Sequence, residues 1–174
     1  MSTINIRTEE ANDIDIIFQI NSTAFDTAAE AELVNRLREQ AEPFLSLVAE
    51  QDGTLLGHLL LTPVTLDADQ DNSSELKLMG LAPMAVMPDN QNSGIGSALV
   101  EAGLTHCRNL GIGAVVVLGH PEYYPRFGFE PSVNFNIKSE YEVPAEVFMA
   151  QELLPGYLQK VSGTIQYHPA FNEL

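Results

Sequence analysis

Cysteine pairs and long apolar runs are both missing from this 174-residue sequence. A membrane-spanning helix needs about 18 or more consecutive apolar residues, and because no stretch reaches that length we expect no membrane partner. The single cysteine, Cys107, excludes an internal disulfide and a thiolate metal cluster, and its helix-patterned neighbours favour a buried thiol. The first ten residues lack the features of a secretory signal, so a cytoplasmic location is the expectation.

Basic residues are scarce as well, since 8 Lys and Arg stand against 24 Asp and Glu, a formal net charge of -16. Nucleic-acid binding is therefore disfavoured, because it depends on clustered Lys and Arg that neutralise phosphates. The acidic residues are scattered, and they either guide a cationic substrate inward or form a solvated surface. The four histidines lie apart without paired spacing, so no metal site is predicted.

The length of the chain, without internal repeats or linkers, predicts one domain over residues 1–174. Apolar periodicity distinguishes helices from strands along its first half. The expected elements there are a strand at 4–7, helices at 11–25 and 27–40, two strands within 44–66 joined at Gln51, Asp52 and Gly53, and a polar loop at 67–74.

A strand–helix–strand unit is expected at the centre of the chain. Residues 75–86 read as a strand in which Gly80 and Pro83 indicate a bulge or a break in pairing. A helix follows until Gly111, and the continuously apolar run at 113–119 reads as a covered strand. The remaining expected elements are a short helix at 121–127, a strand at 133–139, a turn or helix at 144–154 and a strand at 160–167. The fold class is therefore mixed α/β, mostly antiparallel with one parallel crossover.

The glycine turn, residues 88–97 (PDNQNSGIGS), separates the central strand from the central helix. N–H groups at a helix start lack intrahelical acceptors, and the peptide dipoles add partial positive charge there, so an anion can bind. Gly94 and Gly96 carry no side chain that would obstruct a phosphate. Taken alone, the pattern is also that of an ordinary helix cap. Two phosphate motifs are absent, because no Gly-Lys-Ser/Thr follows and Leu99 occupies the third-glycine position of a dinucleotide fingerprint.

Two linked motifs resemble the GNAT superfamily of acyl-CoA N-acyltransferases. The run QNSGIG at residues 91–96 is similar to the family's Gln/Arg-x-x-Gly-x-Gly/Ala motif, which follows a strand ending in Ala-Val. The run YYPRFGF at 123–129 is similar to a bacterial group of small predicted acetyltransferases with Tyr-Tyr-x-Arg-Phe-Gly-Phe. The resemblance covers roughly residues 78–130. It implies a GNAT-like fold, a mixed and mostly antiparallel sheet flanked by helices.

The resemblance also implies a site for acetyl-CoA or another short acyl-CoA. The backbone of residues 92–97 would hold the pyrophosphate, and the main chain of the preceding strand would pair with the pantetheine arm as a strand edge pairs with a peptide. One departure is that positions 92, 93 and 97 lack the Arg often found in this loop. The residues assigned to cofactor binding are Met84, Ala85, Val86, Gln91, Asn92, Ser93, Gly94, Ile95, Gly96 and Ser97.

Acyl transfer to an amine needs stabilisation of the carbonyl oxygen and a proton for the departing thiolate. The resemblance assigns that proton to Tyr124, whose alternative role is packing, whereas Tyr123 is expected to pack. The base is open, because Glu30 and Glu32 also read as solvated helix residues and His58 as a structural histidine. Arg126 either meets a CoA phosphate or pairs with a carboxylate.

The function that follows is N-acetyl transfer from acyl-CoA to a primary amine by direct attack, since no nucleophile motif is present. Two alternatives remain, a non-catalytic acyl-CoA sensor or partner-binding module and a protein lysine or N-terminal acetyltransferase. The acceptor is a small molecule or a protein, and the sequence leaves the oligomeric state open.

Overall fold

The computed structural model describes residues 3–68 and 76–174, with nine strands and three α-helices among them. The strands are β1 (Asn5–Thr8), β2 (Leu45–Gln51), β3 (Thr54–Ala68), β4 (Leu78–Val86), β5 (Ala114–Leu118), β6 (Glu130–Pro131), β7 (Ile137–Ser139), β8 (Phe148–Glu152) and β9 (Gly163–Gln166). The helices are α1 (Ile14–Ala24), α2 (Ala29–Gln40) and α3 (Ile95–Asn109).

The chain divides into two compact units, each built from segments far apart in the sequence. The first unit comprises Met1–Thr62, Ala82–Gly103 and Pro169–Leu174, and the second comprises Pro63–Leu81 and Leu104–His168. Strands β3 and β4 and helix α3 each contribute residues to both units. The expectation of one domain over residues 1–174 stays a prediction.

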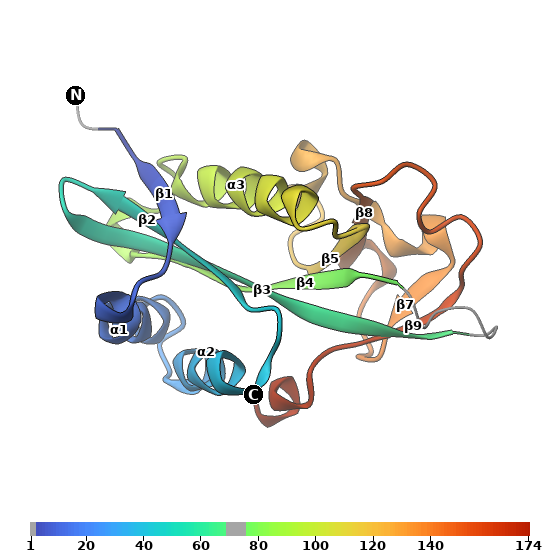
Figure 1. The fold of residues 1–174 in the computed structure, drawn as a ribbon, viewed down its shortest axis with the longest axis horizontal. Helices are drawn as coiled ribbons and strands as arrows, with labels where there is room; N and C mark the ends of the chain where they lie inside the picture. The colour runs from blue at the N-terminus through green and yellow to red at the C-terminus, as the bar shows by residue number, and fades with distance from the viewer. Residues whose placement is uncertain (1–2, 69–75) are drawn as a thin grey trace. The chain divides into compact units, whose positions relative to one another are not determined.

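Antiparallel strands form the sheet of the first unit. Strand β1 pairs with β2, and β2 pairs with β3 through the hairpin that the sequence predicted. Its turn has positive φ angles at Asp52 (53°) and Gly53 (81°), which match the right-handed twist of the strands. Helices α1 and α2 lie on one face of these strands, and α3 lies on the other (Figure 1).

Successive residues of β3 face opposite sides of this sheet, as the pleat requires. Gly57 faces α3, where a Cβ would contact Ile95 and Leu99, whereas His58 faces α1 and bonds to Asn21. The α3 side of β3 continues with Leu59 and Leu61, both fully buried. Each such side chain contributes about 1.5–3 kcal/mol to stability, so the seam between β3 and α3 is a principal part of the core.

The second unit contains the parallel strand pair that the sequence predicted. Leu78–Leu81 of β4 pairs in parallel with Ala114–Val117 of β5, and β5 pairs antiparallel with β8, which pairs with β6. The end of β3 pairs antiparallel with β9, which runs parallel to β7. Gly80 is paired opposite Val116, and the β4–β5 ladder ends at Leu81, two residues before Pro83. The predicted break therefore lies on the proline side.

Three local predictions were wrong in part. In the range 144–154, the 3₁₀ helix Ala145–Val147 agrees with the predicted turn or helix. Residues 148–152 instead form strand β8, because burial of Phe148 and Met149 and pairing with β5 override the helix propensity of Ala, Glu and Leu. The strand predicted at 133–139 begins only at Ile137, after a 3₁₀ helix over Ser132–Phe135. In the loop predicted at 67–74, residues 67 and 68 belong to β3, and residues 69–74 lie outside the described residues.

Over residues 3–68 and 76–174, none of the helices has the length and apolar character needed to cross a bilayer. Within the same ranges, no group of three His, Cys, Asp or Glu residues is arranged to hold a metal ion.

Candidate active site

The glycine turn connects β4 to α3 within the first unit. A 3₁₀ helix, Pro88–Asn90, precedes two left-handed residues, Asn92 with φ 63° and Gly94 with φ 88°. A Cβ placed on Gly94 would meet nothing within 4 Å, so the space in front of the turn is open. The first helical hydrogen bond runs from Ala98 N to Gly94 O at 3.0 Å. The N–H groups of Ile95 and Gly96 precede this first helical bond, which is the position from which the start of a helix donates to an anion.

Hydrogen bonds hold the glycine turn to the strands beside it. Met87 N donates to Leu56 O of β3 at 2.8 Å, and Asn90 N donates to Met87 O at 2.8 Å. The Gln91 side chain donates to Val86 O at 3.2 Å, and the Ser93 hydroxyl donates to Asn90 O. Two side chains predicted to bind cofactor thus shape the turn itself. What this arrangement offers an anion is backbone N–H groups.

The last residues of β4 lie directly before the glycine turn. Ala85 is buried, whereas Met84 and Val86 are half-buried. The Val86 carbonyl already accepts the Gln91 amide, although a carbonyl oxygen has two lone pairs and can accept a second bond. The residues predicted for the pantetheine arm and for the pyrophosphate therefore form one continuous segment of the first unit.

Tyr124 belongs to the second unit and begins the 3₁₀ helix Tyr124–Phe127. Its side chain is buried, with ring contacts in T-shaped geometry to Tyr123 at 5.1 Å and to Phe129 at 5.8 Å between centroids. Burial, together with the nearby Tyr123, raises the pKa of Tyr124 to about 12. The phenol is therefore protonated at neutral pH, as a proton donor must be, and it also packs.

Tyr123 and Arg126 lie on the outer side of the same 3₁₀ helix. Tyr123 is half-buried and packs edge-on against Phe127, with 5.2 Å between ring centroids. The Arg126 guanidinium lies over the Tyr123 ring, 4.8 Å from its centroid, which is cation–π distance. The packing predicted for Tyr123 is confirmed. Arg126 is exposed, and its guanidinium is oriented by these two rings.

His58 is a structural histidine, which was one of the two roles predicted for it. Its ring is fully buried, with Nδ1 3.1 Å from Asn21 Nδ2 and Nε2 2.9 Å from Ser46 Oγ. Burial lowers the pKa of His58 to about 3, so the ring is neutral and both of its nitrogens are engaged. It is not available as a base for the amine. These partners could not be predicted from sequence patterns, because Asn21 and Ser46 lie on other elements.

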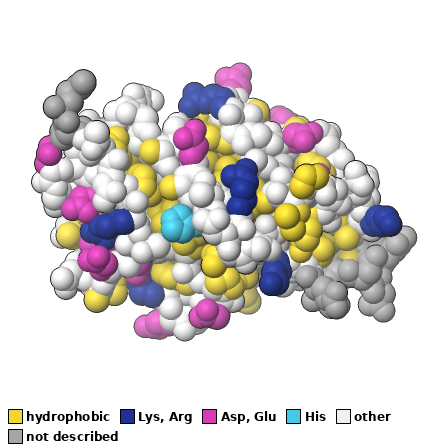
Figure 2. Space-filling view, turned by 45° about the horizontal axis from the view of Figure 1, so that its top comes forward, with side chains coloured by type: hydrophobic (Ala, Val, Ile, Leu, Met, Phe, Trp, Pro, Cys, Tyr) yellow, Lys and Arg dark blue, Asp and Glu magenta, His cyan; other side chains and the backbone are white. Residues whose placement is uncertain are grey.

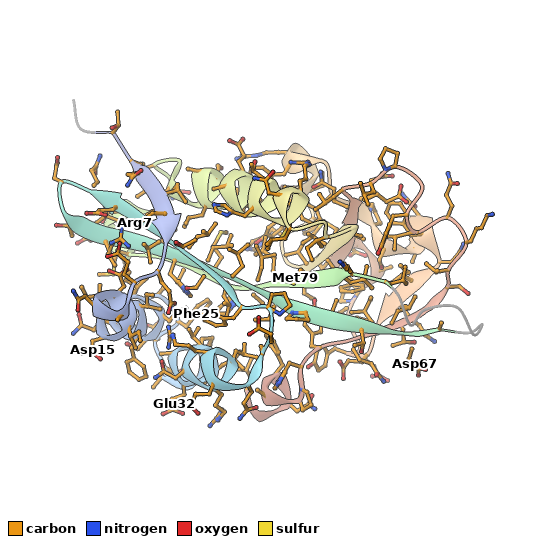
Figure 3. All side chains as sticks on the ribbon, in the orientation of Figure 1. Arg7, Asp15, Phe25, Glu32, Asp67 and Met79 are labelled. Carbon is orange, nitrogen blue, oxygen red and sulfur yellow. The ribbon has the colours of Figure 1, made fainter. Side chains whose placement is uncertain are left out.

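The two glutamates considered as bases lie at the start of α2. Glu32 is exposed on the outer side of the helix (Figure 3), and Glu30 accepts a hydrogen bond from the Thr27 hydroxyl at 3.4 Å. These surroundings are those of ordinary helix-surface residues. On the face drawn in Figure 2, the acidic side chains are scattered among uncharged ones. We assign no base.

Comparison with known proteins identifies a family for this chain and similar structures that were solved with a ligand. The model of a family described as the acetyltransferase (GNAT) domain matches residues 5–132. The uncharacterized N-acetyltransferase YjhQ of Escherichia coli K12 is 39% identical over 141 residues, covering 79% of this chain and 76% of that protein. The uncharacterized N-acetyltransferase YhbS of the same organism is 33% identical over 168 residues, covering 96% and 98%.

Two solved structures are similar over almost the whole chain. The crystal structure of the GNAT family N-acetyltransferase YhbS from Escherichia coli in complex with CoA has a TM-score of 0.89 and 32% identity, covering 99% of this chain and 93% of that one. The crystal structure of a GNAT family acetyltransferase from Brucella melitensis in complex with acetyl-CoA has a TM-score of 0.78 and 33% identity, covering 97% and 98%.

Proposed function

The chain belongs to the GNAT acetyltransferase family, and from that premise we propose that it transfers an acetyl or short acyl group from acyl-CoA directly to a primary amine. Acyl-CoA-dependent acetyl transfer is what the family and its similar members support. The acceptor, the site residues and the direct route are the proposed parts.

The observation that carries the proposal is the glycine turn at the start of α3. Its two left-handed residues, its open front at Gly94 and the first-turn N–H groups suit a diphosphate, which needs several donors and room for its oxygens. In the two similar structures the bound molecules are CoA and acetyl-CoA, each of which carries such a diphosphate. The residues of this turn therefore fit the proposed substrate.

In the proposed reaction, the nitrogen of a neutral amine forms a bond to the thioester carbonyl carbon, the carbon–sulfur bond breaks, and the nitrogen releases one proton to solvent water. Main-chain N–H groups near Ala85 and Val86 would stabilise the oxygen on which negative charge develops. The Tyr124 hydroxyl would give its proton to the departing thiolate. Burial raises the pKa of the Cys107 thiol to about 12, which argues against an acyl-enzyme at that residue and favours direct transfer.

The acceptor class is proposed from charge. A net charge of -16 attracts a cationic amine over distances of about 8 Å at physiological salt. A cationic primary amine is the acceptor class that this argument favours, and the class includes small amines as well as a protein lysine or N-terminus. The cytoplasmic location expected from the sequence stays a prediction.

The first experiment measures thermal unfolding with and without acetyl-CoA. At a concentration one hundred times the dissociation constant, binding adds about 2.7 kcal/mol, a rise in Tm of roughly 5–11 °C for a chain of this size. The same protein is then mixed with acetyl-CoA and a panel of polyamines, amino sugars, lysine peptides and N-terminal peptides, and free thiol is recorded. Thiol release with a small amine supports the proposal. An unchanged Tm contradicts the assigned cofactor, and binding without thiol release indicates the sensor alternative.

A further inference from the structure

Gly57 of β3 lies beneath the start of α3 in the first unit. A Cβ built on Gly57 would lie 2.9 Å from Cγ2 of Ile95, 3.1 Å from Cδ1 of Leu99 and 3.3 Å from the Ala85 carbonyl oxygen. Non-bonded carbon atoms in folded proteins lie more than 3.0 Å apart, so any larger residue at position 57 would displace the Ile95 side chain. The absent side chain therefore allows the first turn of α3 to sit directly on the sheet.

The residue before Gly57 fixes the other end of the glycine turn. Leu56 O accepts the hydrogen bond from Met87 N at 2.8 Å, immediately before the turn begins. Ile95, the first residue of α3, is 2% exposed and rests on Gly57 at the point where the turn ends. Two adjacent residues of β3 thus hold both ends of the segment that separates β4 from α3.

We propose that Gly57 is a positioning residue for acyl-CoA, which sets the height of the α3 start above the sheet and so the place of the pyrophosphate-binding N–H groups. The inference rests on the proposed role of the glycine turn. Gly57 acts through Ile95, and its main effect falls on the ligand's diphosphate, because the Ala85 carbonyl oxygen, 3.3 Å from the added Cβ, is less crowded than Ile95. A methyl group at this position requires the Ile95 side chain to shift. In this proposal the backbone of Ile95 and Gly96 shifts with it by a few tenths of an ångström, and hydrogen bonds depend steeply on such shifts.

The test compares Gly57→Ala with a matched control, Gly103→Ala. A Cβ on Gly103 of α3 would lie 2.9 Å from Leu61 Cδ1 and 3.2 Å from Leu59 Cδ2, so the added methyl group meets side chains at similar distances in the same seam between β3 and α3. Gly103 stands two turns along α3, away from the glycine turn. We expect Gly57→Ala to weaken acetyl-CoA binding about tenfold, the factor for one lost bond to a charged group. Gly103→Ala should bind within about twofold of the wild type.

A second ligand separates positioning from general loss of structure. S-acetylpantetheine lacks the diphosphate, so its affinity or its kcat/KM should fall much less in Gly57→Ala than the affinity for acetyl-CoA does. Steady-state rates with acetyl-CoA should show a raised KM with little change in kcat. If Gly57→Ala folds poorly, the double variant Gly57→Ala, Ile95→Ala removes the Cγ2 atom in the way, and it should recover most of the acetyl-CoA affinity.

Each result has a distinct meaning. Failure of the wild type to bind acetyl-CoA overturns the proposed function and this inference with it. Wild-type binding with an unchanged affinity in Gly57→Ala overturns the inference alone. Equal losses in Gly57→Ala and Gly103→Ala, equal losses for both ligands, or no recovery in the double variant would show a merely structural role and would also overturn it.

Discussion

Asn21 donates from Nδ2 to Nδ1 of His58 across 3.1 Å, with both side chains fully buried in the first unit. The amide nitrogen can only donate, so Nδ1 accepts and the ring proton resides on Nε2, 2.9 Å from the Ser46 hydroxyl. This bond joins α1 to β3 and consumes the basic nitrogen of the ring. A buried neutral histidine of this kind resists protonation, which gives the protein a specific acid sensitivity.

We expect the free energy of unfolding to fall by about 2 kcal/mol between pH 7 and pH 5. The pKa of His58 is lowered from 6.5 to about 3, so below pH 6.5 the unfolded chain takes up a proton that the folded chain does not. The contribution of His58 to the free energy of unfolding is fully present above pH 6.5 and declines as the pH falls toward 3. The 1.5 units between 6.5 and 5, at about 1.36 kcal/mol each, give the stated loss. Urea unfolding at several pH values measures it.

The control is His58→Gln, which keeps a neutral polar side chain and removes the titration. Its stability should be lower overall but nearly level between pH 7 and 5. Glu9 and Asp13, whose pKa values are lowered chiefly by Arg38 and Arg7, affect stability below their ordinary values of 4.5 and 3.8, outside this window. If the free energy of unfolding fell by the same amount between pH 7 and 5 in the wild type and in His58→Gln, His58 would not be the source of the acid sensitivity.

Gly94→Ala should weaken acetyl-CoA binding by about tenfold or more. The φ of 88° at this residue is costly for any L side chain, so alanine destabilises the turn by about 1–2 kcal/mol and shifts its N–H groups. Gly111→Ala is the matched control, because Gly111 has φ 77° with nothing within 4 Å of a Cβ and lies beyond the other end of α3. Isothermal titration should find a loss of acetyl-CoA affinity only in Gly94→Ala. Equal affinities in the two variants would contradict the proposed binding of the diphosphate at the glycine turn.

Tyr124→Phe should lower kcat by roughly 10²–10⁴-fold while leaving the KM for acetyl-CoA nearly unchanged. The reason is that phenylalanine keeps the ring contacts with Tyr123 and Phe129 and removes only the proton that the thiolate needs. Stopped reactions with saturating amine measure the change. Tyr123→Phe serves as control and should retain wild-type turnover. A Tyr124→Phe enzyme within twofold of the wild type would assign Tyr124 to packing alone.

The pH profile offers an independent check on the same residue. Burial raises the pKa of Tyr124 to about 12, and an acid acts only below its pKa, so its contribution should persist throughout the range from pH 7 to 10. The rate should therefore rise as the amine acceptor loses its proton and should not fall again by pH 10. A fall in kcat centred near pH 9 that is absent in Tyr124→Phe would mean that Tyr124 loses its proton there. That result would contradict the raised pKa of the buried phenol.

The parts of the fold that local pattern determines were predictable. The β2–β3 hairpin follows from Asp52 and Gly53, and the end of α3 follows from Gly111, because each residue type suits the left-handed backbone found there. Strand β8 was not predictable from its own residues, since Ala150 and Glu152 favour helix. Its state is decided by the ladder to β5, a strand more than thirty residues earlier.

The same division holds for the candidate site. The glycine turn was visible because its glycines and small polar residues stand together in sequence. Gly57 was not, because its crowding against Ile95 depends on how β3 meets α3. The roles of Gln91 and Ser93 in shaping the turn depend on carbonyl directions that residue types do not reveal. Contacts between distant elements are thus the information that sequence patterns omit.

Replacement of Ser93 by arginine should strengthen acetyl-CoA binding, in a salt-dependent way. The glycine turn contains no Lys or Arg, and the chain carries a net charge of -16, so wild-type affinity at the proposed site would rest on N–H groups against long-range repulsion. Raising the salt from 50 to 300 mM should therefore leave wild-type affinity constant or raise it slightly. Ser93 is exposed, and an arginine there adds a cation beside the proposed diphosphate site, for an expected gain of about fivefold at low salt.

The acetyl-CoA affinity of Ser93→Arg should approach that of the wild type at 300 mM salt, because the Debye length falls below about 8 Å. Ser93→Gln is the control, since it also removes the hydroxyl bond to Asn90 but adds no charge, and it should not bind more tightly than the wild type. Titration of acetyl-CoA at four salt concentrations measures all three proteins. A steep loss of wild-type affinity with salt would mean that cations elsewhere carry the phosphate contacts, and an arginine without effect would place the diphosphate away from Ser93.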